Sequence, residues 1–131
     1  MFPIIPLGLT LFGAGCSSDP KRLSESSEAE LAYGEGIGLF DQGFYKNAIP
    51  ALDKAIQLDP DYADAYNNRG WSYANLGEYQ TAIADYTKAI QLDRDSALAY
   101  TNRGNSYRVL VRYASADADE TTACSLASSF C

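Results

Sequence analysis

The hexapeptide KAIQLD occurs at residues 54–59 and again at residues 88–93, which is an offset of 34 positions. Shifting the whole chain by 34 residues also aligns single positions over three copies. Five such columns are not expected by chance, so the chain contains an internal repeat. The aligned columns are Gly36/Gly70/Gly104, Tyr45/Tyr79/Tyr113, Ala48/Ala82/Ala116, Ala55/Ala89/Ala123 and Leu58/Leu92/Leu126.

The three copies cover residues 29–62, 63–96 and 97–131, which together form one domain over 29–131. Each copy divides into two halves whose apolar residues recur at helical spacing. In the second copy the halves are 63–75 and 79–92, and Gly77 between them favours a helix end. Pro60 separates the first copy from the second. Ser27 and Glu30 have the spacing of a capping box, which predicts that the first helix starts there.

The 34-residue length, the Gly and Ala columns, the aromatic columns and the Asp59-Pro60 turn resemble the tetratricopeptide repeat. The resemblance implies an all-α fold, an α-solenoid of three antiparallel helix pairs stacked in a right-handed superhelix. Small residues such as Gly70 and Ala82 would let the two helices of a pair approach closely. One pair buries too little surface to be stable alone, and three repeats are about the minimum.

The third copy departs most from the pattern. Val111 replaces the glycines of the first two copies, Glu120 and Cys124 replace apolar residues, and the segment after Tyr113 is polar. A terminal repeat has no successor to cover its outer face, so this polarity favours a capping role. A truncated longer array is the alternative.

Residues 1–15, MFPIIPLGLTLFGAG, carry no charge and are mostly apolar. They are too few for a membrane-spanning helix, which needs about 20 residues, and are typical of a signal peptide or apolar leader. The stretch 13–16 resembles a lipobox, although Gly13 stands where Leu is preferred. The resemblance implies lipidation of Cys16 and a membrane-anchored lipoprotein of the bacterial cell envelope. Residues 16–28 are expected to be a flexible polar tether; ordinary secretion, a retained anchor or a cytoplasmic location are the alternatives.

Cys124 and Cys131 remain if Cys16 takes lipid, in a compartment that permits disulfides. On one continuous helix their Cα atoms would lie about 10.5 Å apart, too far for a bridge, which needs less than about 7 Å. The repeat register, however, predicts that the helix ends near residues 127–128, after which the chain can turn back. Either the two cysteines are bridged, or Cys124 is a small buried residue and Cys131 is free.

The chain has 131 residues, a net charge of −7 and no histidine. The absence of histidine excludes Ser-His-Asp and Cys-His catalysis and histidine-metal sites. The acidic balance argues against binding to nucleic acid. No C-x-x-C motif supports a thiol redox enzyme, the alternative from another functional class. We therefore expect no catalytic, cofactor-binding or metal-binding residues.

The resemblance implies a non-catalytic scaffold that binds an extended peptide or a partner helix in a concave groove. An Asn amide there can donate to and accept from a peptide backbone, and Trp71 offers a flat apolar contact. The alternative is that these residues serve packing between helices. The groove positions are Tyr33, Asn67, Asn68, Trp71, Asn102, Asn105 and Arg108.

Some relatives clamp a C-terminal carboxylate with two Lys, one Arg and two Asn. The matching positions in this sequence are Tyr33, Ile37, Asn68, Leu98 and Asn102, and only Asn68 fits. An acidic peptide tail is therefore not the expected ligand. The sequence predicts a protein or peptide partner, with the membrane engaged only through the N-terminal lipid or leader. A cytosolic or membrane-associated assembly factor or co-chaperone is the alternative function.

Two Arg–Asp pairs recur at one spacing. Arg69 and Asp85 are 16 residues apart, as are Arg103 and Asp119, whereas the first copy lacks both partners. This correlation predicts salt bridges between the two helices of the second and third repeats. If partly exposed, each contributes only about 0–1 kcal/mol.

Overall fold

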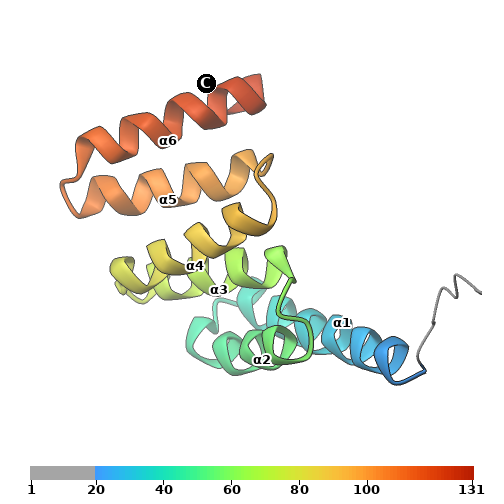
Figure 1. Ribbon diagram of the computed structural model, residues 1–131. Coiled ribbons are helices and arrows are strands. Elements are labelled where there is room, and N and C mark those ends of the chain that lie inside the picture. Colours follow the sequence, from blue (N-terminus) through green and yellow to red (C-terminus); the bar gives the residue numbers. More distant parts are fainter. Residues whose placement is uncertain (1–19) are drawn as a thin grey trace, which may run out of the picture.

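The computed structural model describes residues 20–131 (Figure 1). This part of the chain is all-α and contains no strand, as predicted. Its helices are α1 (Pro20–Asp41), α2 (Tyr45–Leu58), α3 (Ala63–Asn75), α4 (Tyr79–Leu92), α5 (Ala97–Val109) and α6 (Tyr113–Leu126), followed by the short 3-10 helix η1 (Ser128–Phe130).

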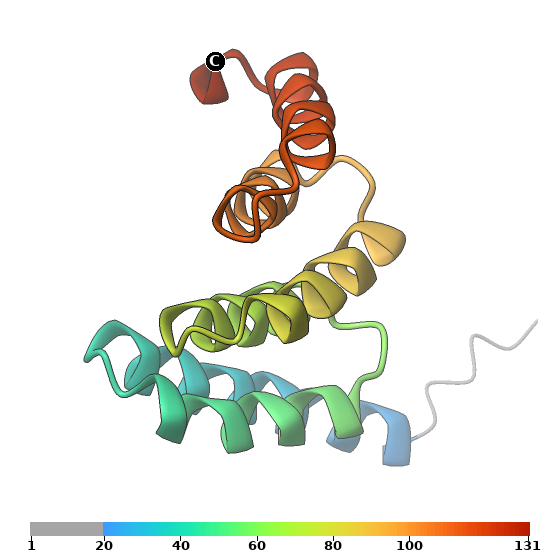
Figure 2. The same cartoon turned by 90° about the vertical axis from the view of Figure 1, so that its left-hand side faces the viewer.

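The helices pack as three successive pairs. The pairs α1–α2, α3–α4 and α5–α6 lie one above another in a single stack, with the first pair and the third at opposite ends (Figures 1 and 2). Each pair also packs on the next, through α2 against α3 and α4 against α5. The arrangement is a solenoid of three helix pairs, which confirms the predicted fold class.

Close approach within a pair depends on the glycine column. A Cβ built on Gly70 of α3 would lie 3.1 Å from the carbonyl oxygen of Ala82 and 2.9 Å from Cε1 of Tyr86, both on α4. Ala82 and Tyr86 are themselves buried. The backbones of α3 and α4 therefore meet where the sequence has its smallest residues.

Contact between successive pairs depends on alanines. Ala65 of α3 packs with Ala32 and Ala55 of the first pair, and all three are buried. Ala99 of α5 packs in the same way on Ala89 and Ile90 of α4. Each repeat thus covers the first helix of the next one, which explains why the same columns recur every 34 residues.

The turns inside the pairs require a positive φ. Gly43 and Gly77 follow α1 and α3 with φ of 79° and 82°. Val111 occupies the corresponding position after α5 with φ of 60°. The left-handed conformation costs a non-glycine residue roughly 1–2 kcal/mol. The repeat packing therefore imposes the turn on a residue that does not favour it.

The N-terminal boundary differs from the sequence expectation. Helix α1 begins at Pro20, so residues 20–28, assigned to a flexible tether, are helical. Proline is favoured in the first turn of a helix, and the next two turns add i,i+4 contacts such as Lys21 with Glu25 at 4.0 Å. The predicted capping box is also wrong, because the Ser27 hydroxyl lies within the helix and donates to the Leu23 carbonyl oxygen at 2.7 Å.

The leader 1–15, Cys16 and the remainder of the tether lie outside the described residues. Within residues 20–131, no helix combines the length and the apolar character that crossing a membrane requires.

At the C-terminus the chain leaves α6 after Leu126 and turns back through η1, where the repeat register placed the helix end. Cys124 and Cys131 are paired as a disulfide, with Cα atoms 5.0 Å apart. We expect both of these cysteines to resist alkylation under denaturing conditions until a reductant is added. Peptide mapping by mass spectrometry checks this, and two freely alkylated thiols at these positions would contradict the bridge.

Candidate functional site

The first helix of each pair lines one side of the stack. Helix α1 contacts α3, and α3 contacts α5, whereas no comparable contact joins α2 to α4 or α4 to α6. Helices on the inside of a curved stack lie closer together than those on the outside. The surface formed by α1, α3 and α5, called the inner face below, is therefore the concave one.

Trp71 is a large, partly exposed aromatic residue of the inner face. Its side chain is 40% exposed, and its ring lies 4.9 Å from that of Phe40 on α1. The Phe40 ring is in turn 5.3 Å from Tyr45, which opens α2. The Phe40 ring supports one side of the indole, and the exposed side of the indole is free to contact another molecule.

A small hollow of about 120 Å³ lies beside Trp71. It runs between the second and third repeats, and its wall combines aromatic rings with amide and hydroxyl groups. This combination suits a side chain of a bound peptide. The hollow is lined by Trp71, Ala74, Tyr79, Tyr86, Asn102, Asn105, Ser106 and Val109.

The predicted asparagines are mostly engaged within the protein. The Asn68 amide donates to the Tyr33 hydroxyl at 3.0 Å and to the Asp64 carbonyl at 2.9 Å. The Asn102 amide donates to Oδ1 of Asn67 at 3.2 Å, and Asn67 is buried. Both bonds join first helices of adjacent repeats, so these side chains connect the repeats.

Tyr33 stays neutral over a wide range of pH. Burial, followed by the negative charge of Asp64, raises the pKa of Tyr33 to about 12. Its ring also packs on Tyr62, with centroids 4.7 Å apart. The Tyr33 hydroxyl therefore stays protonated at physiological pH, and its oxygen accepts the hydrogen bond from the Asn68 amide.

Asn105 and Arg108 differ in the hollows that they line and in their charge partners. Asn105 is exposed and borders two hollows, the one beside Trp71 and a second of about 180 Å³ between α5 and α6. Arg108 lines only the second hollow and pairs there with Glu120, and with Asp117 at 3.6 Å. Its charge is thus balanced by α6. Of the seven predicted groove residues, Trp71, Asn105 and Arg108 are exposed, and of these three only Arg108 is held by ion pairs.

Both predicted salt bridges are confirmed. Arg69 donates to both carboxylate oxygens of Asp85 at 2.8 and 2.6 Å, and Arg103 does so to Asp119 at 2.8 and 2.7 Å. The carboxylates are buried, so these pairs are less exposed than the sequence estimate assumed. The hydrogen bonds to Asp85 are the largest cause that raises the pKa of Arg69.

Sequence reasoning missed a second contact of each arginine. Arg69 also reaches Asp53 of α2 at 2.7 Å, and Arg103 reaches Thr87 of α4 at 3.1 Å. Each partner lies 16 residues before its arginine, the same spacing as the aspartate that follows. This equal spacing before and after each arginine was the signal in the sequence that could have indicated the second contact. Each arginine therefore connects its own pair to the preceding one.

Among residues 20–131, no group of three Cys, Asp or Glu side chains is placed to hold a metal ion.

Comparison with known proteins supports the repeat assignment. Residues 63–96 match the tetratricopeptide repeat model, and residues 38–77 match a second model described as a TPR repeat. The first of these matches coincides with the second copy defined above. No curated protein sequence is similar enough to this chain to be matched.

Solved structures are similar over most of the chain. The Arabidopsis OM64 TPR domain is 30% identical, with 80% of this chain and 87% of that one covered and a TM-score of 0.79. The TPR2B domain of yeast Sti1, solved in its pHsp70 complex, is 33% identical, with 77% and 81% covered and a TM-score of 0.75. The first TPR of Spaghetti (RPAP3), bound to the HSP90 peptide SRMEEVD, is 28% identical, with 78% and 81% covered and a TM-score of 0.76.

The repeat columns, the three stacked helix pairs and these matches agree. The chain belongs to the tetratricopeptide repeat family.

Proposed function

We propose that this protein is a non-catalytic interaction scaffold that binds an extended peptide or a partner helix on its inner face. The observation that carries the proposal is Trp71, which is 40% exposed in the middle repeat and supported by Phe40. Half-exposed aromatic side chains with a rigid backing are typical anchors of protein interfaces. Peptide complexes of similar domains support the same use of the fold.

The charge of the inner face favours a neutral or basic ligand. Exposed carboxylates stand on it at Glu30, Asp41 and Asp64, whereas Arg108 is already paired with α6. The peptide SRMEEVD in the complex of a similar domain is acidic. Like charges across an interface are unfavourable. We therefore expect this chain to select peptides with an apolar anchor and a basic residue, and not SRMEEVD.

A displayed peptide library tests this expectation on the immobilised full chain. Selected peptides should be enriched in Lys or Arg together with an aromatic or aliphatic residue. Trp71→Ala should weaken their binding about 10-fold or more, as truncation of an interface anchor does. Because Trp71 is partly exposed, the variant should keep the helical circular dichroism of the parent chain.

Two controls separate the inner face from other surfaces. Leu31→Asp changes an exposed residue of α1 away from Trp71 and should leave the selected peptides bound. Synthetic SRMEEVD should not compete with them. Selected peptides that bind Trp71→Ala as tightly as the parent chain would contradict the proposal.

Replacement of Asn68 or Asn102 is expected to lower stability, and not only to weaken peptide binding as the sequence suggests. Because Asn68 and Asn102 join adjacent repeats, their replacement acts first on repeat packing. Loss of one such hydrogen bond costs about 1 kcal/mol. Peptide binding by Asn68→Ala and Asn102→Ala is therefore informative only alongside a measurement of stability, whereas Asn105→Ala reports on the hollow beside Trp71 directly.

For the location, we propose attachment to the bacterial cell envelope through lipid on Cys16. The apolar run before Cys16 and its small neighbours support this proposal. Cells that express the full chain in the presence of a labelled fatty acid should transfer the label to the protein, and Cys16→Ala should abolish the transfer. An unlabelled protein in the soluble fraction would instead support a cytosolic assembly factor.

A further inference from the structure

One face of α1 is open where the matching faces of α3 and α5 are covered. Leu31 belongs to the same repeat column as Ala65 and Ala99, yet it is 75% exposed while both alanines are completely buried. Gly38 is exposed in the column of Ser72 and Ser106, which are also buried. The open face of α1, defined by Leu31, Gly34, Glu35 and Gly38, is therefore the equivalent of a surface that is an interface elsewhere in this chain.

The structure shows twice what covers such a face. Helix α2 lies on α3, where Ala55 packs against Ala65, and helix α4 lies on α5, where Ala89 packs against Ala99. In both cases the covering element is the second helix of the preceding pair. Helix α1 has no preceding pair in the described part of the chain. A single amphipathic helix with small residues where it contacts α1 would therefore fit the open face.

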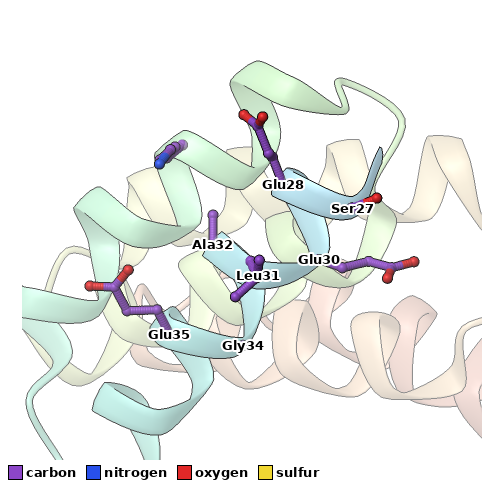
Figure 3. Close-up of a pocket in the computed structure, with 8 residues that line it drawn as sticks. Ser27, Glu28, Glu30, Leu31, Ala32, Gly34 and Glu35 are labelled. Carbon is purple, nitrogen blue, oxygen red and sulfur yellow. The ribbon is translucent and has the colours of Figure 1, made fainter. Parts of the chain in front are cut away.

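The surface of α1 is hollowed at this place. A shallow hollow of about 910 Å³, largely open to solvent, runs along the helix and has Lys54 of α2 at its edge. Figure 3 shows Leu31 at its centre, with Glu28 and Glu35 directed to one side of α1 and Glu30 to the other. A Cβ at Gly34 or Gly38 would touch nothing within 4 Å, so a second helix can come close to the α1 backbone.

The charge of this face indicates the chemistry of its partner. Glu35 occupies the column of Arg69 and Arg103, which reach back to Asp53 and Thr87 on the covering helix. The first repeat therefore presents a carboxylate where the others present a guanidinium. Glu28 and Glu35, which are directed to the same side of α1, border the hollow, with Lys54 of α2 at its edge. A covering helix with Lys or Arg at the position of Asp53 would pair with Glu35.

We propose that the open face of α1 is a second docking site, distinct from the inner face, for an amphipathic helix of a partner protein. That helix presents Ala or Gly to Leu31 and a basic side chain to Glu35. It would extend the solenoid by one helix in the way that α2 covers α3. The site stands on a surface other than the proposed groove and does not depend on it.

The probe for this site is the sequence of α4, Tyr79–Leu92, with Thr87 replaced by Lys. Thr87 of α4 contacts Arg103 of α5. Glu35 is the α1 residue in the column of Arg103, so Lys at position 87 of the peptide would contact Glu35. Because a free 14-residue helix is marginal in water, the peptide is stapled across positions 80 and 84, which are exposed on α4. Titration into the isotope-labelled full chain is followed by the backbone amide signals in NMR spectra.

The expected shifts map to Leu31, Gly34 and Gly38, with little change at Trp71. The peptide with Lys at position 87 should bind roughly 5-fold more tightly than the matched peptide with Glu, at low salt. Glu35→Arg should reverse that order. Leu31→Asp should weaken binding about 10-fold or more, since it removes an apolar contact from an exposed position and leaves the fold intact.

Several results would overturn the proposal. One is that the folded full chain binds neither peptide; another is that the shifts concentrate on Trp71 and Asn105. Equal affinity of the Lys and Glu peptides for the parent chain and for Glu35→Arg would also refute it. If dilution of the protein alone shifts the signals of Gly34 and Gly38, a second copy occupies the face and the assigned partner is wrong.

Discussion

Arg69→Ala is expected to lower the free energy of unfolding by about 3 kcal/mol, at the lower end of the range for one partner removed from a buried ion pair. Arg69 connects Asp85 on α4 with Asp53 on α2 through distances of 2.6 and 2.7 Å. The Asp85 side chain is only 8% exposed, so its charge would remain buried without a partner. Urea unfolding followed by circular dichroism measures the loss.

Arg108→Ala is the matched control. Arg108 also pairs with two carboxylates, but all three of these side chains are about half exposed or more. Its replacement should change stability by no more than about 0.5 kcal/mol. The double variant Arg69→Ala/Asp85→Ala should recover part of the loss, because the uncompensated charge is gone. A loss in Arg69→Ala as small as that in Arg108→Ala would show that the network does not connect the repeats.

Gly70→Leu is expected to destabilise the protein by about 3 kcal/mol, the upper range for an overpacked core. Any side chain at this position meets Tyr86 at 2.9 Å and both the Ala82 oxygen and Cβ of Asp85 at 3.1 Å. The Ala82 oxygen belongs to the backbone, so it can move only if α4 moves away from α3. That movement would also lengthen the bonds between Arg69 and Asp85.

Gly34→Leu is the control for the glycine prediction. Gly34 also lies within a helix, but an added Cβ there meets no atom within 4 Å. Leucine is the better helix former, so this variant should be more stable than the parent chain by up to about 1 kcal/mol. Thermal and urea unfolding of the two variants should therefore move in opposite directions. Equal destabilisation by both would attribute the effect to leucine itself and not to helix contact.

The fold and its internal pairs were predictable because neighbouring repeats make the same contacts. A residue that repeats every 34 positions meets the same neighbours each time, so the columns report helix contact directly. The glycine column, the turn at Gly77 and the Arg69–Asp85 pair were obtained in this way. The contact of Arg69 with Asp53 was not predictable in the same way, because the next repeat has Thr87 in the column of Asp53 and the Arg–Asp pair does not recur.

The candidate site was only partly predictable. Helical periodicity placed Asn67, Asn68 and Asn102 on the first helices, but it gave no distance between one first helix and the next. The structure brings these helices into contact and uses the amides between them. Residues 20–28 were misassigned because a polar, serine-rich stretch is compatible with both a tether and a solvated helix.

By itself the sequence determined the all-α class, the three helix pairs, the turns between them and the absence of histidine chemistry. These properties depend on local preference and on contacts that recur with the repeat. Only the tertiary structure decided what each side chain of a column faces. Leu31 and Ala65 hold the same place in their repeats, yet one is exposed and the other buried, because a helix precedes the second repeat and none precedes the first in the described chain.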